Sequence, residues 1–297
     1  MTWSGGLVDW IEDNTAFISV VFSWQLDLAY QRAVWYKQQG YRVRAGGPAV
    51  IVQPDYLSSV VEIGGEVNAL SRHNPEATFT SRGCIRNCAF CLVPKIEGNI
   101  RELPDDQWQP KRVICDNNLL ATSEIHFNHV IDRINNIVGI DFNQGLDARL
   151  LNDDHAKRLA ELKGATIRLA WDNIKTENQF MIAFDKLIKA GIPKSRIKVF
   201  VLLGYKDTPE DTLYRLETIR DLGAIPNPMR YQPIDTKRRN EYIGEHWTKK
   251  ELAKYMRYWA RLSWFNGIKF EDYDFHQKAK DNDIALPGMQ ARGLAHP

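Results

Sequence analysis

Cys84-Ile85-Arg86-Asn87-Cys88-Ala89-Phe90-Cys91 contains three of the four cysteines of the chain, in the spacing C-x3-C-x2-C. Three thiolates this close cannot all form disulfides, but their short loop can surround one soft metal centre. Cysteine thiolates are the ligands of iron–sulfur clusters. Because three ligands are one fewer than the usual four, a cubane held here leaves one iron open to a substrate or cofactor. That arrangement indicates chemistry rather than simple electron storage.

This spacing resembles the signature of the radical S-adenosylmethionine (radical SAM) superfamily, and Phe90, the aromatic before the last cysteine, fits the same pattern. The resemblance implies that Cys84, Cys88 and Cys91 are both the metal ligands and the catalytic residues, that they hold a [4Fe–4S] cluster, and that SAM binds the open iron. It also implies reductive cleavage of SAM to methionine and a 5′-deoxyadenosyl radical. A zinc knuckle is the alternative, but zinc sites usually add a second ligand pair, and no His or Cys pair follows at such spacing.

The composition is that of an ordinary soluble globular protein, with 297 residues, 44% apolar and 26% charged residues and a formal net charge of +2. No run approaches the roughly 18 apolar residues of a membrane span, and residues 1–4 do not begin a signal peptide. Four cysteines in a chain of this length do not indicate a disulfide scaffold. We therefore expect a cytoplasmic protein without a membrane partner, whose exposed cluster is sensitive to oxygen. The net charge does not by itself call for a polyanionic partner.

Residues 1–75 are expected to form a small Rossmann-like α/β unit. A strand at 16–22, a helix at 26–39 and a strand at 41–44 give the order β-α-β, and Gly46-Gly47-Pro48 is expected to form a turn. The unit lacks G-x-G-x-x-G, so a dinucleotide role has no support. Its order resembles a shortened cobalamin-binding-like domain of one radical SAM branch. That branch often has a D-x-H-x-x-G loop, but residues 23–27 contain no histidine, which favours a packing domain.

Residues 76–235 alternate strand-like with helix-like segments. We expect strands at 77–81, 112–115, 138–142, 166–170, 197–203 and 228–232, and helices at 125–135, 153–162, 177–190 and 209–222. Gly191 and Gly223 follow two of these helices, where C-terminal caps are expected. Repeated βα units predict a parallel sheet with right-handed crossovers, and six units match the partial (βα)6 TIM-like barrel of the radical SAM fold. In such barrels the active site lies at the carboxyl ends of the strands.

The end of the second expected strand carries Cys115, Asp116 and Asn117. We expect Cys115 to be a buried strand cysteine outside the ligand set. Family members place polar groups at this point against the methionyl amine of SAM, which Asp116 and Asn117 suit by charge and hydrogen bonding. A helix-capping role for these two residues is the alternative.

The third and fourth strand ends carry further candidates for contacts to SAM. Gln144, Asp147 and Arg149 follow the third strand and can point into the mouth of the barrel. Arg149 can pair with the SAM carboxylate in a bidentate fork, or instead form an ion pair with Asp147. Related enzymes place a polar residue at the end of the fourth strand on the ribose hydroxyls, which Asp172 suits, unless it caps the next helix.

The fifth strand and the residues after it resemble the G-x-I-x-G-x-x-E motif that supports adenine in the family. Leu202 and Gly204 match the apolar and second glycine positions. Phe200 departs from the motif at the first glycine, and Asp207 is a shorter acid. The resemblance implies that the backbone at Leu203 and Gly204 contacts adenine.

Residues 236–297 are expected to form a C-terminal extension, helical at first and loosely ordered from Asp281 onward. Residues 237–239, Lys-Arg-Arg, follow the sixth strand at the substrate opening and can meet phosphate or carboxylate groups, or can be a solvated face. Apolar residues at three- and four-residue spacing in 249–264 predict an amphipathic helix that closes the side of the barrel.

The resemblance implies a radical SAM enzyme that abstracts hydrogen from an unidentified substrate and takes its electron from a reductant such as flavodoxin or ferredoxin. With no cysteine beyond Cys115, an auxiliary cluster is not expected. Three alternatives remain open. They are a cobalamin-assisted radical methyltransferase, a non-catalytic iron–sulfur redox or sensor protein, and a nucleic-acid-modifying radical enzyme that binds through Arg230 and residues 237–239.

Overall fold

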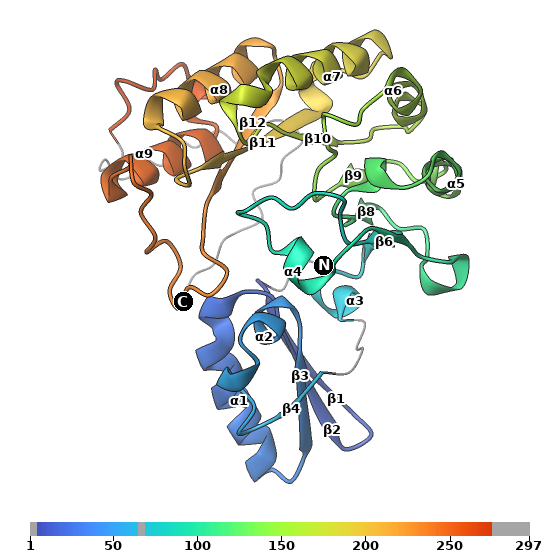
Figure 1. Cartoon of the computed structure of the whole chain (residues 1–297), viewed down its shortest axis with the longest axis vertical. Helices are drawn as coiled ribbons and strands as arrows, with labels where there is room; N and C mark the ends of the chain where they lie inside the picture. Colours follow the sequence, from blue (N-terminus) through green and yellow to red (C-terminus); the bar gives the residue numbers. More distant parts are fainter. Residues whose placement is uncertain (1–4, 65–68, 275–297) are drawn as a thin grey trace.

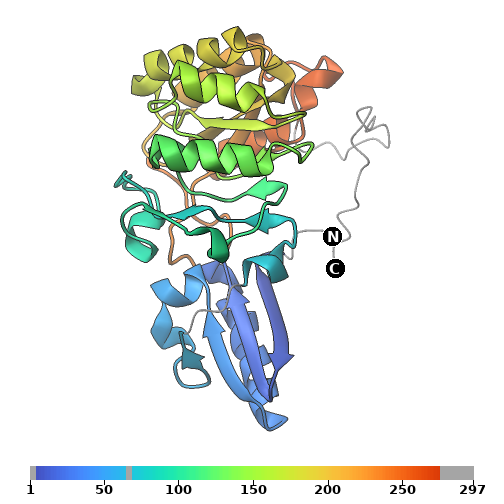
Figure 2. The same ribbon diagram turned by 90° about the vertical axis from the view of Figure 1, so that its right-hand side faces the viewer.

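Strands followed by helices make up most of the chain in the computed structural model, which describes residues 5–64 and 69–274. The strands are β1 (Leu7–Glu12), β2 (Thr15–Val20), β3 (Arg42–Gly46), β4 (Glu62–Ile63), β5 (Ala77–Thr78), β6 (Ser81–Arg82), β7 (Arg101–Glu102), β8 (Val113–Ile114), β9 (Asp141–Phe142), β10 (Ile167–Ala170), β11 (Ile197–Leu203) and β12 (Ile225–Arg230). The α-helices are α1 (Leu26–Gln38), α2 (Pro48–Val52), α3 (Leu70–His73), α4 (Val93–Ile96), α5 (Glu124–Ile134), α6 (Asp153–Ala160), α7 (Glu177–Lys189), α8 (Pro209–Asp221) and α9 (Lys249–Ala260). Figures 1 and 2 show the elements up to β4 below a larger body formed by the later ones.

The lower body is a mixed sheet in the order β1-β2-β3-β4, with α1 beside it. Strands β2 and β3 are parallel and joined through α1, so the predicted β-α-β order is confirmed. The sequence did not predict β1, which pairs antiparallel with β2. The predicted turn at Gly46-Gly47-Pro48 is partly wrong, because Gly46 ends β3 and Pro48 begins α2. Proline suits the first turn of a helix, where its missing N–H costs no hydrogen bond.

Parallel strands form the centre of the larger body in two sheets, β5-β8-β9 and β10-β11-β12. Isolated parallel bridges join Asp141 to Thr166 and Leu146 to Leu169, so strands of one sheet neighbour strands of the other in chain order. The result is a mixed α/β fold, and no closed barrel forms among the residues that the structure describes. All these parallel strands end at one edge, which is where the loops that carry the candidate residues begin.

The sheet β10-β11-β12 has one face covered by helices and one left partly open. In β11 the buried residues alternate with half-buried ones: Ile197, Val199 and Val201 are fully buried, whereas Lys198 and Phe200 are not. The covered face packs against α7 and α8, which contribute buried apolar side chains to the same core. This alternation is the period-two pattern of a strand with two different faces.

The expected strands and helices are largely confirmed, with differences at particular boundaries. The bounds of β11 agree with the prediction, and α5 to α8 begin and end within one or two residues of the expected positions. The expected strand at 77–81 divides into β5 and β6, because the buried Asp116 carboxylate accepts the N–H of Thr80 between them (2.6 Å) and Ser81 pairs with Glu102 of β7. The expected strand at 138–142 shortens to β9, since Gly139 has a positive φ of 78° and donates to Lys163 O (2.8 Å).

The C-terminal helix α9 packs beside β12 and α8 (Figure 1). The Tyr255 hydroxyl donates to Pro209 O (2.8 Å) at the start of α8. The helix ends at Ala260 rather than at 264, because Leu262 adopts a left-handed conformation (φ 55°). The predicted loose tail from Asp281 lies outside the described residues. Within the described ranges, no helix has the length and apolar character needed to cross a bilayer.

Candidate functional site

The cysteine loop lies between β6 and α4 and is held by backbone contacts at both ends. Cys84 N donates to Gly98 O (3.1 Å), and Cys91 N donates to Cys88 O (2.9 Å). Gly83, just before the loop, has a φ of 79°, and a Cβ at this position would lie 2.1 Å from Asn99 O. Only glycine can adopt this backbone and allow so close an approach. The glycine therefore sets where the loop leaves β6.

The thiols of Cys84, Cys88 and Cys91 are all half-buried and influence one another electrostatically. Burial raises the pKa of Cys88 and of Cys91, and the charge of the neighbouring thiols raises both further. The Arg149 guanidinium acts in the opposite direction on Cys88, because a nearby cation favours the thiolate. The Cys84 sulfur accepts the Arg86 N–H (3.3 Å) and the Asn118 side-chain amide (3.5 Å).

Two arginines meet at Asp147 beside the cysteine loop. Arg86 Nε lies 2.9 Å from Asp147 Oδ2, while Arg149 donates from Nε (2.7 Å) and Nη2 (3.0 Å). Burial works against the charged form of Asp147, but the hydrogen bonds from the two arginines outweigh it and lower its pKa. The alternative ion pair between Arg149 and Asp147 is thus present, and Arg149 at the same time approaches Cys88. The sequence analysis missed Arg86 as a site residue, although it stands between two of the cysteines.

Asp116 and Asn117 support the cysteine loop from behind. Asp116 is buried, and its carboxylate accepts from Thr80 N (2.6 Å) and Ser81 Oγ (2.8 Å). Burial raises the pKa of Asp116, although these hydrogen bonds oppose the shift. Asn117 donates to Glu97 Oε2 (2.8 Å), which also accepts Gly83 N–H (2.8 Å). Both predicted polar residues therefore have partners within the fold, and their contacts join β5, β6 and the end of β8.

Cys115 stands apart from the three clustered thiols. It follows β8 and is buried, as predicted. Burial raises the pKa of its thiol to about 12, so the thiol stays protonated at neutral pH.

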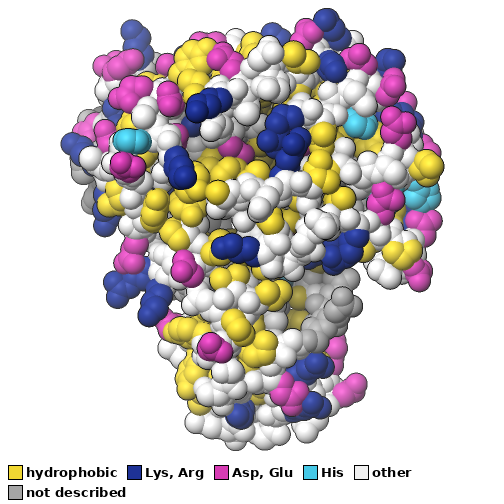
Figure 3. Space-filling model, viewed as in Figure 1, with side chains coloured by type: hydrophobic (Ala, Val, Ile, Leu, Met, Phe, Trp, Pro, Cys, Tyr) yellow, Lys and Arg dark blue, Asp and Glu magenta, His cyan; other side chains and the backbone are white. Residues whose placement is uncertain are grey.

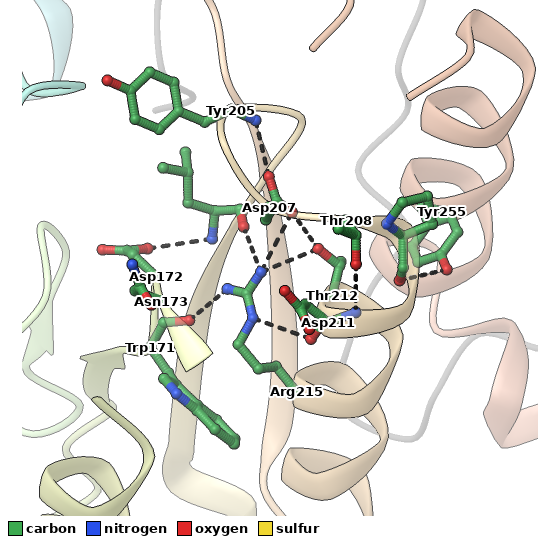
Figure 4. Close-up of polar contacts among 12 residues, drawn as sticks. Trp171, Asp172, Asn173, Tyr205, Asp207, Thr208, Asp211, Thr212, Arg215 and Tyr255 are labelled. Atoms are coloured by element: carbon green, nitrogen blue, oxygen red, sulfur yellow. Dashed lines mark hydrogen bonds and ion pairs between the residues drawn. The ribbon is translucent and has the colours of Figure 1, made fainter. Parts of the chain in front are cut away.

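Asp172 follows the end of β10 and lies against β11 (Figure 4). The Asp172 carboxylate accepts the N–H of Leu202 (3.2 Å) and contributes to the raised pKa values of Cys88 and Cys91. Burial raises the pKa of Asp172 to about 6, and Arg215 and Arg149 oppose that shift. Gln144, after β9, is exposed on the surface of its loop.

A fully buried arginine on α8, Arg215, fixes the strand ends around Asp172 (Figure 4). Its guanidinium donates to Trp171 O (2.8 Å) and Leu202 O (3.1 Å), and it pairs with Asp207 Oδ2 (3.4 Å). Asp207, the shorter acid at the last position of the family motif, thus belongs to a network that positions these strand ends. The sequence analysis missed Arg215, because nothing in a polar helix segment shows that one arginine turns inward.

The residues predicted to contact adenine lie at the end of β11. Leu203 is fully buried and its carbonyl accepts Tyr231 N–H (2.9 Å). Gly204 has a φ of 79°, and a Cβ there would come within 2.8 Å of the Leu252 side chain. Phe90 from the cysteine loop contacts the next residue, Tyr205, with ring centroids 5.9 Å apart in an edge-on arrangement. The structure therefore brings the cysteine loop to the end of β11.

The donor chemistry of this site fits an iron–sulfur cluster. The loop supplies three thiols and the Arg86 N–H that donates to the Cys84 sulfur. From outside the loop, the Asn118 amide also donates to the Cys84 sulfur, and the Arg149 guanidinium lies beside Cys88. Thiolates are iron–sulfur ligands, and hydrogen bonds to sulfur tune such centres. In residues 5–64 and 69–274, however, no three His, Cys, Asp or Glu side chains already stand in the arrangement that holds a metal ion.

The assignment of a function to this chain depends on the geometry of the site. No protein-family model matches the sequence, and no curated protein matches it significantly.

Proposed function

We propose that this chain is a radical SAM enzyme, in which Cys84, Cys88 and Cys91 hold a [4Fe–4S] cluster and SAM binds at its open iron. The observation that carries the proposal is that these three half-buried thiols share one short loop, in which the charge of Cys84 raises the pKa of Cys88 and of Cys91, whereas Cys115 is buried after β8. Three thiolates and one open coordination position are what such a cluster requires for binding a second molecule.

The fold supports the proposal through the position of the loop. The strands β5, β8, β9, β10, β11 and β12 neighbour one another in chain order, through sheet pairing and isolated bridges, and helices follow most of them. This order agrees with a partial (βα)6 barrel over residues 76–235, preceded by a small α/β unit. The cysteine loop follows the first of these strands, and the other candidate residues follow the next strands at the same edge.

Each side chain near the loop has a role that its contacts support. Arg149 is charged and is oriented by Asp147. It can bind the carboxylate of SAM through the guanidinium N–H groups that do not donate to Asp147. Asp172, half-buried at the end of β10, can accept hydrogen bonds from ribose hydroxyls. Arg86 and Asn118 orient the sulfur of Cys84 by hydrogen bonding.

The cluster, when bound, supplies the electron and the open iron for reductive cleavage of SAM. The protein would position the cluster and SAM and shield them from water. The half-buried loop limits access of water to the thiols, and the tyrosine and phenylalanine rings at the end of β11 border the site on the substrate side. Hydrogen abstraction from a substrate follows from this chemistry, with a small electron-transfer protein such as flavodoxin or ferredoxin as the electron donor.

The test compares single alanine variants of the four cysteines after anaerobic reconstitution. Cys84→Ala, Cys88→Ala and Cys91→Ala are each expected to lose most of the iron and nearly all formation of 5′-deoxyadenosine from SAM under reducing conditions. Cys115→Ala is the matched control, and it is expected to keep about four irons per chain, the complement of one cubane, together with cleavage.

Iron and sulfide analysis combined with turnover of SAM separates the possible outcomes. SAM cleavage by the Cys88→Ala protein contradicts the radical SAM assignment. Loss of the cluster from a folded Cys115→Ala protein contradicts the three-ligand arrangement.

A further inference from the structure

Three tyrosines at the carboxyl edge of β11 and β12 form a continuous aromatic surface, which we name the tyrosine cluster: Tyr205, Tyr231 and Tyr242. The ring centroids of Tyr205 and Tyr231 lie 4.7 Å apart at 54°, and those of Tyr231 and Tyr242 lie 5.1 Å apart at 82°. Tyr205 also meets Phe90 of the cysteine loop. Figure 4 shows the Tyr205 side chain directed away from the polar network of Asp207 and Arg215. The cluster therefore extends from the proposed active site outward.

The tyrosine cluster does not have the properties of a packed core. All three residues are half-buried, and their hydroxyls have no hydrogen-bond partner in the described part of the chain. Tyr255 and Tyr258, in contrast, belong to the core and donate to Pro209 O (2.8 Å) and Ile268 O (2.6 Å). Tyrosines buried for stability usually find such a partner. Tilted rings with free hydroxyls leave aromatic edges and faces available to a ligand.

Basic residues are neighbours of the tyrosine cluster in the chain: Lys206 follows Tyr205, and residues 237–239 lie between Tyr231 and Tyr242. Lys206 Nζ lies 5.6 Å from the centre of the Tyr205 ring. Lys237 and Arg239 are exposed and form no ion pair with any described residue, whereas Arg238 reaches Glu241 at 3.4 Å. On the face drawn in Figure 3, Lys and Arg side chains lie beside hydrophobic ones where the larger body meets the N-terminal unit. Lys206 and residues 237–239 thus place cations in the same two chain segments that carry the three rings.

Arg230 has a different role from the other basic residues. The sequence analysis counted it among the groups that would bind nucleic acid, but its guanidinium donates to Asn240 O (2.7 Å) and Tyr242 O (2.8 Å). It therefore holds the loop after β12 in the shape that brings Tyr242 onto Tyr231. Burial lowers the pKa of Arg230, which agrees with an inward position.

We propose that the tyrosine cluster, together with Lys206 and residues 237–239, binds a single-stranded nucleic acid and presents it to the cysteine loop. Aromatic side chains offer stacking surfaces to unpaired bases, and cations beside them neutralise the phosphates that connect the bases. A duplex does not expose the faces of its bases, so the surface suits a single strand. The proposal rests on the proposed function for the chemistry done on the strand, but binding itself requires neither reduction nor SAM.

The test measures fluorescence anisotropy of labelled single strands of about 12 nucleotides, a length within the range of known single-strand sites, with the anaerobically reconstituted full chain and no reductant or SAM. RNA and DNA probes are titrated separately, each at several salt concentrations. We expect saturable binding that weakens as salt increases. A duplex of the same sequence and the corresponding mononucleotides are expected to bind at least about tenfold more weakly, because they offer no stacked single strand.

Variants separate the contributions of rings and charges. Tyr231→Ala is expected to weaken binding about tenfold, as loss of one stacked base does, whereas Tyr231→Phe keeps the ring and most of the affinity. Lys237→Ala combined with Arg239→Ala is expected to reduce the slope of log Kd against log salt by about 1.4, since each phosphate contact on a single strand contributes about 0.7. Lys163→Ala combined with Lys194→Ala is the matched control, because these exposed lysines precede β10 and β11 at the opposite end of the strands.

Several results overturn the inference. They are absence of oligonucleotide binding, equal binding of mononucleotides, and an unchanged salt slope in the Lys237→Ala, Arg239→Ala protein. If Tyr231→Ala does not fold, the Lys237→Ala, Arg239→Ala protein still tests the inference, because both substitutions are at exposed positions. A protein that binds the oligonucleotide but does not cleave SAM contradicts the proposed function and supports the nucleic-acid surface. A protein that cleaves SAM but does not bind the oligonucleotide supports the proposed function and contradicts the nucleic-acid surface.

Discussion

Asp172 gives the stability of the fold a dependence on pH that one substitution removes. Burial raises the pKa of Asp172 in the folded chain to about 6, above the ordinary value of 3.8 for this carboxyl group. Ionisation therefore favours the unfolded chain, so the destabilisation is absent below about pH 4, grows as the pH rises and is complete above about pH 6. Asp172→Asn keeps an oxygen for the Leu202 N–H. We expect the variant to be more stable than the natural chain at neutral pH, by at most about 3 kcal/mol.

Thermal or urea unfolding of the natural chain and the variant across this pH range measures the difference. The extra stability of Asp172→Asn should disappear as the pH falls toward about 4, because Asp172 is then protonated in the folded natural chain. Asp106→Asn is the control for the substitution itself, at an exposed carboxyl group of the short 3₁₀ helix Asp105–Gln107. A constant gain at every pH would show that the effect is not titration of Asp172.

At the scale of elements, the exit from β6 depends on Gly83. Gly83 and Gly98 have positive φ values of 79° and 72°, so alanine at either position strains the backbone by about 1–2 kcal/mol. The two positions differ in the room that is available for an added Cβ atom. A Cβ at Gly83 meets the backbone of Asn99 at 2.1 Å, whereas Gly98 has nothing within 4 Å. We expect Gly83→Ala to displace the cysteine loop and reduce iron loading, and Gly98→Ala to cost stability without losing iron.

Iron content after reconstitution and the midpoint of urea unfolding distinguish the two variants. Equal iron content in Gly83→Ala and Gly98→Ala would mean that the close approach to Asn99 does not position the cysteines. The comparison isolates the position of the loop, because both changes add the same methyl group and impose a similar backbone strain.

At the scale of the whole molecule, the described residues form two separate hydrophobic cores. One lies within residues 7–60 and the other within residues 108–270. Polar contacts between the bodies include Ser23 Oγ donating to Thr236 O (2.6 Å). We expect two unfolding transitions. Ile18→Ala and Leu187→Ala each remove a buried side chain from one core and should cost about 2–5 kcal/mol there, shifting only the transition of that core.

Differential scanning calorimetry of the two variants tests this independence. A single transition that moves equally in both proteins would show that the bodies unfold as one cooperative unit. Two transitions with selective shifts would mean that the N-terminal unit folds on its own core, as the division at residue 75 predicts.

The sequence by itself determined the elements whose signals are local. A nearly continuous apolar run specified β11, and Gly191 and Gly223 marked the ends of α7 and α8. The cysteine spacing located the candidate site, and Cys115 was correctly expected to be buried. These features depend on residues a few positions apart, so neighbouring side chains are sufficient to predict them.

Only the tertiary structure decided the partners of polar side chains, because those partners lie far away in the sequence. Asp116, which is expected to contact SAM, accepts hydrogen bonds from Thr80 and Ser81, about 35 residues earlier in the chain. Arg215 turns inward from α8 because the carbonyl groups of Trp171 and Leu202 need donors in a buried place. The tyrosine cluster likewise assembles from the ends of β11 and β12 and the following loop, which adjoin only because the strands are parallel and end at one edge.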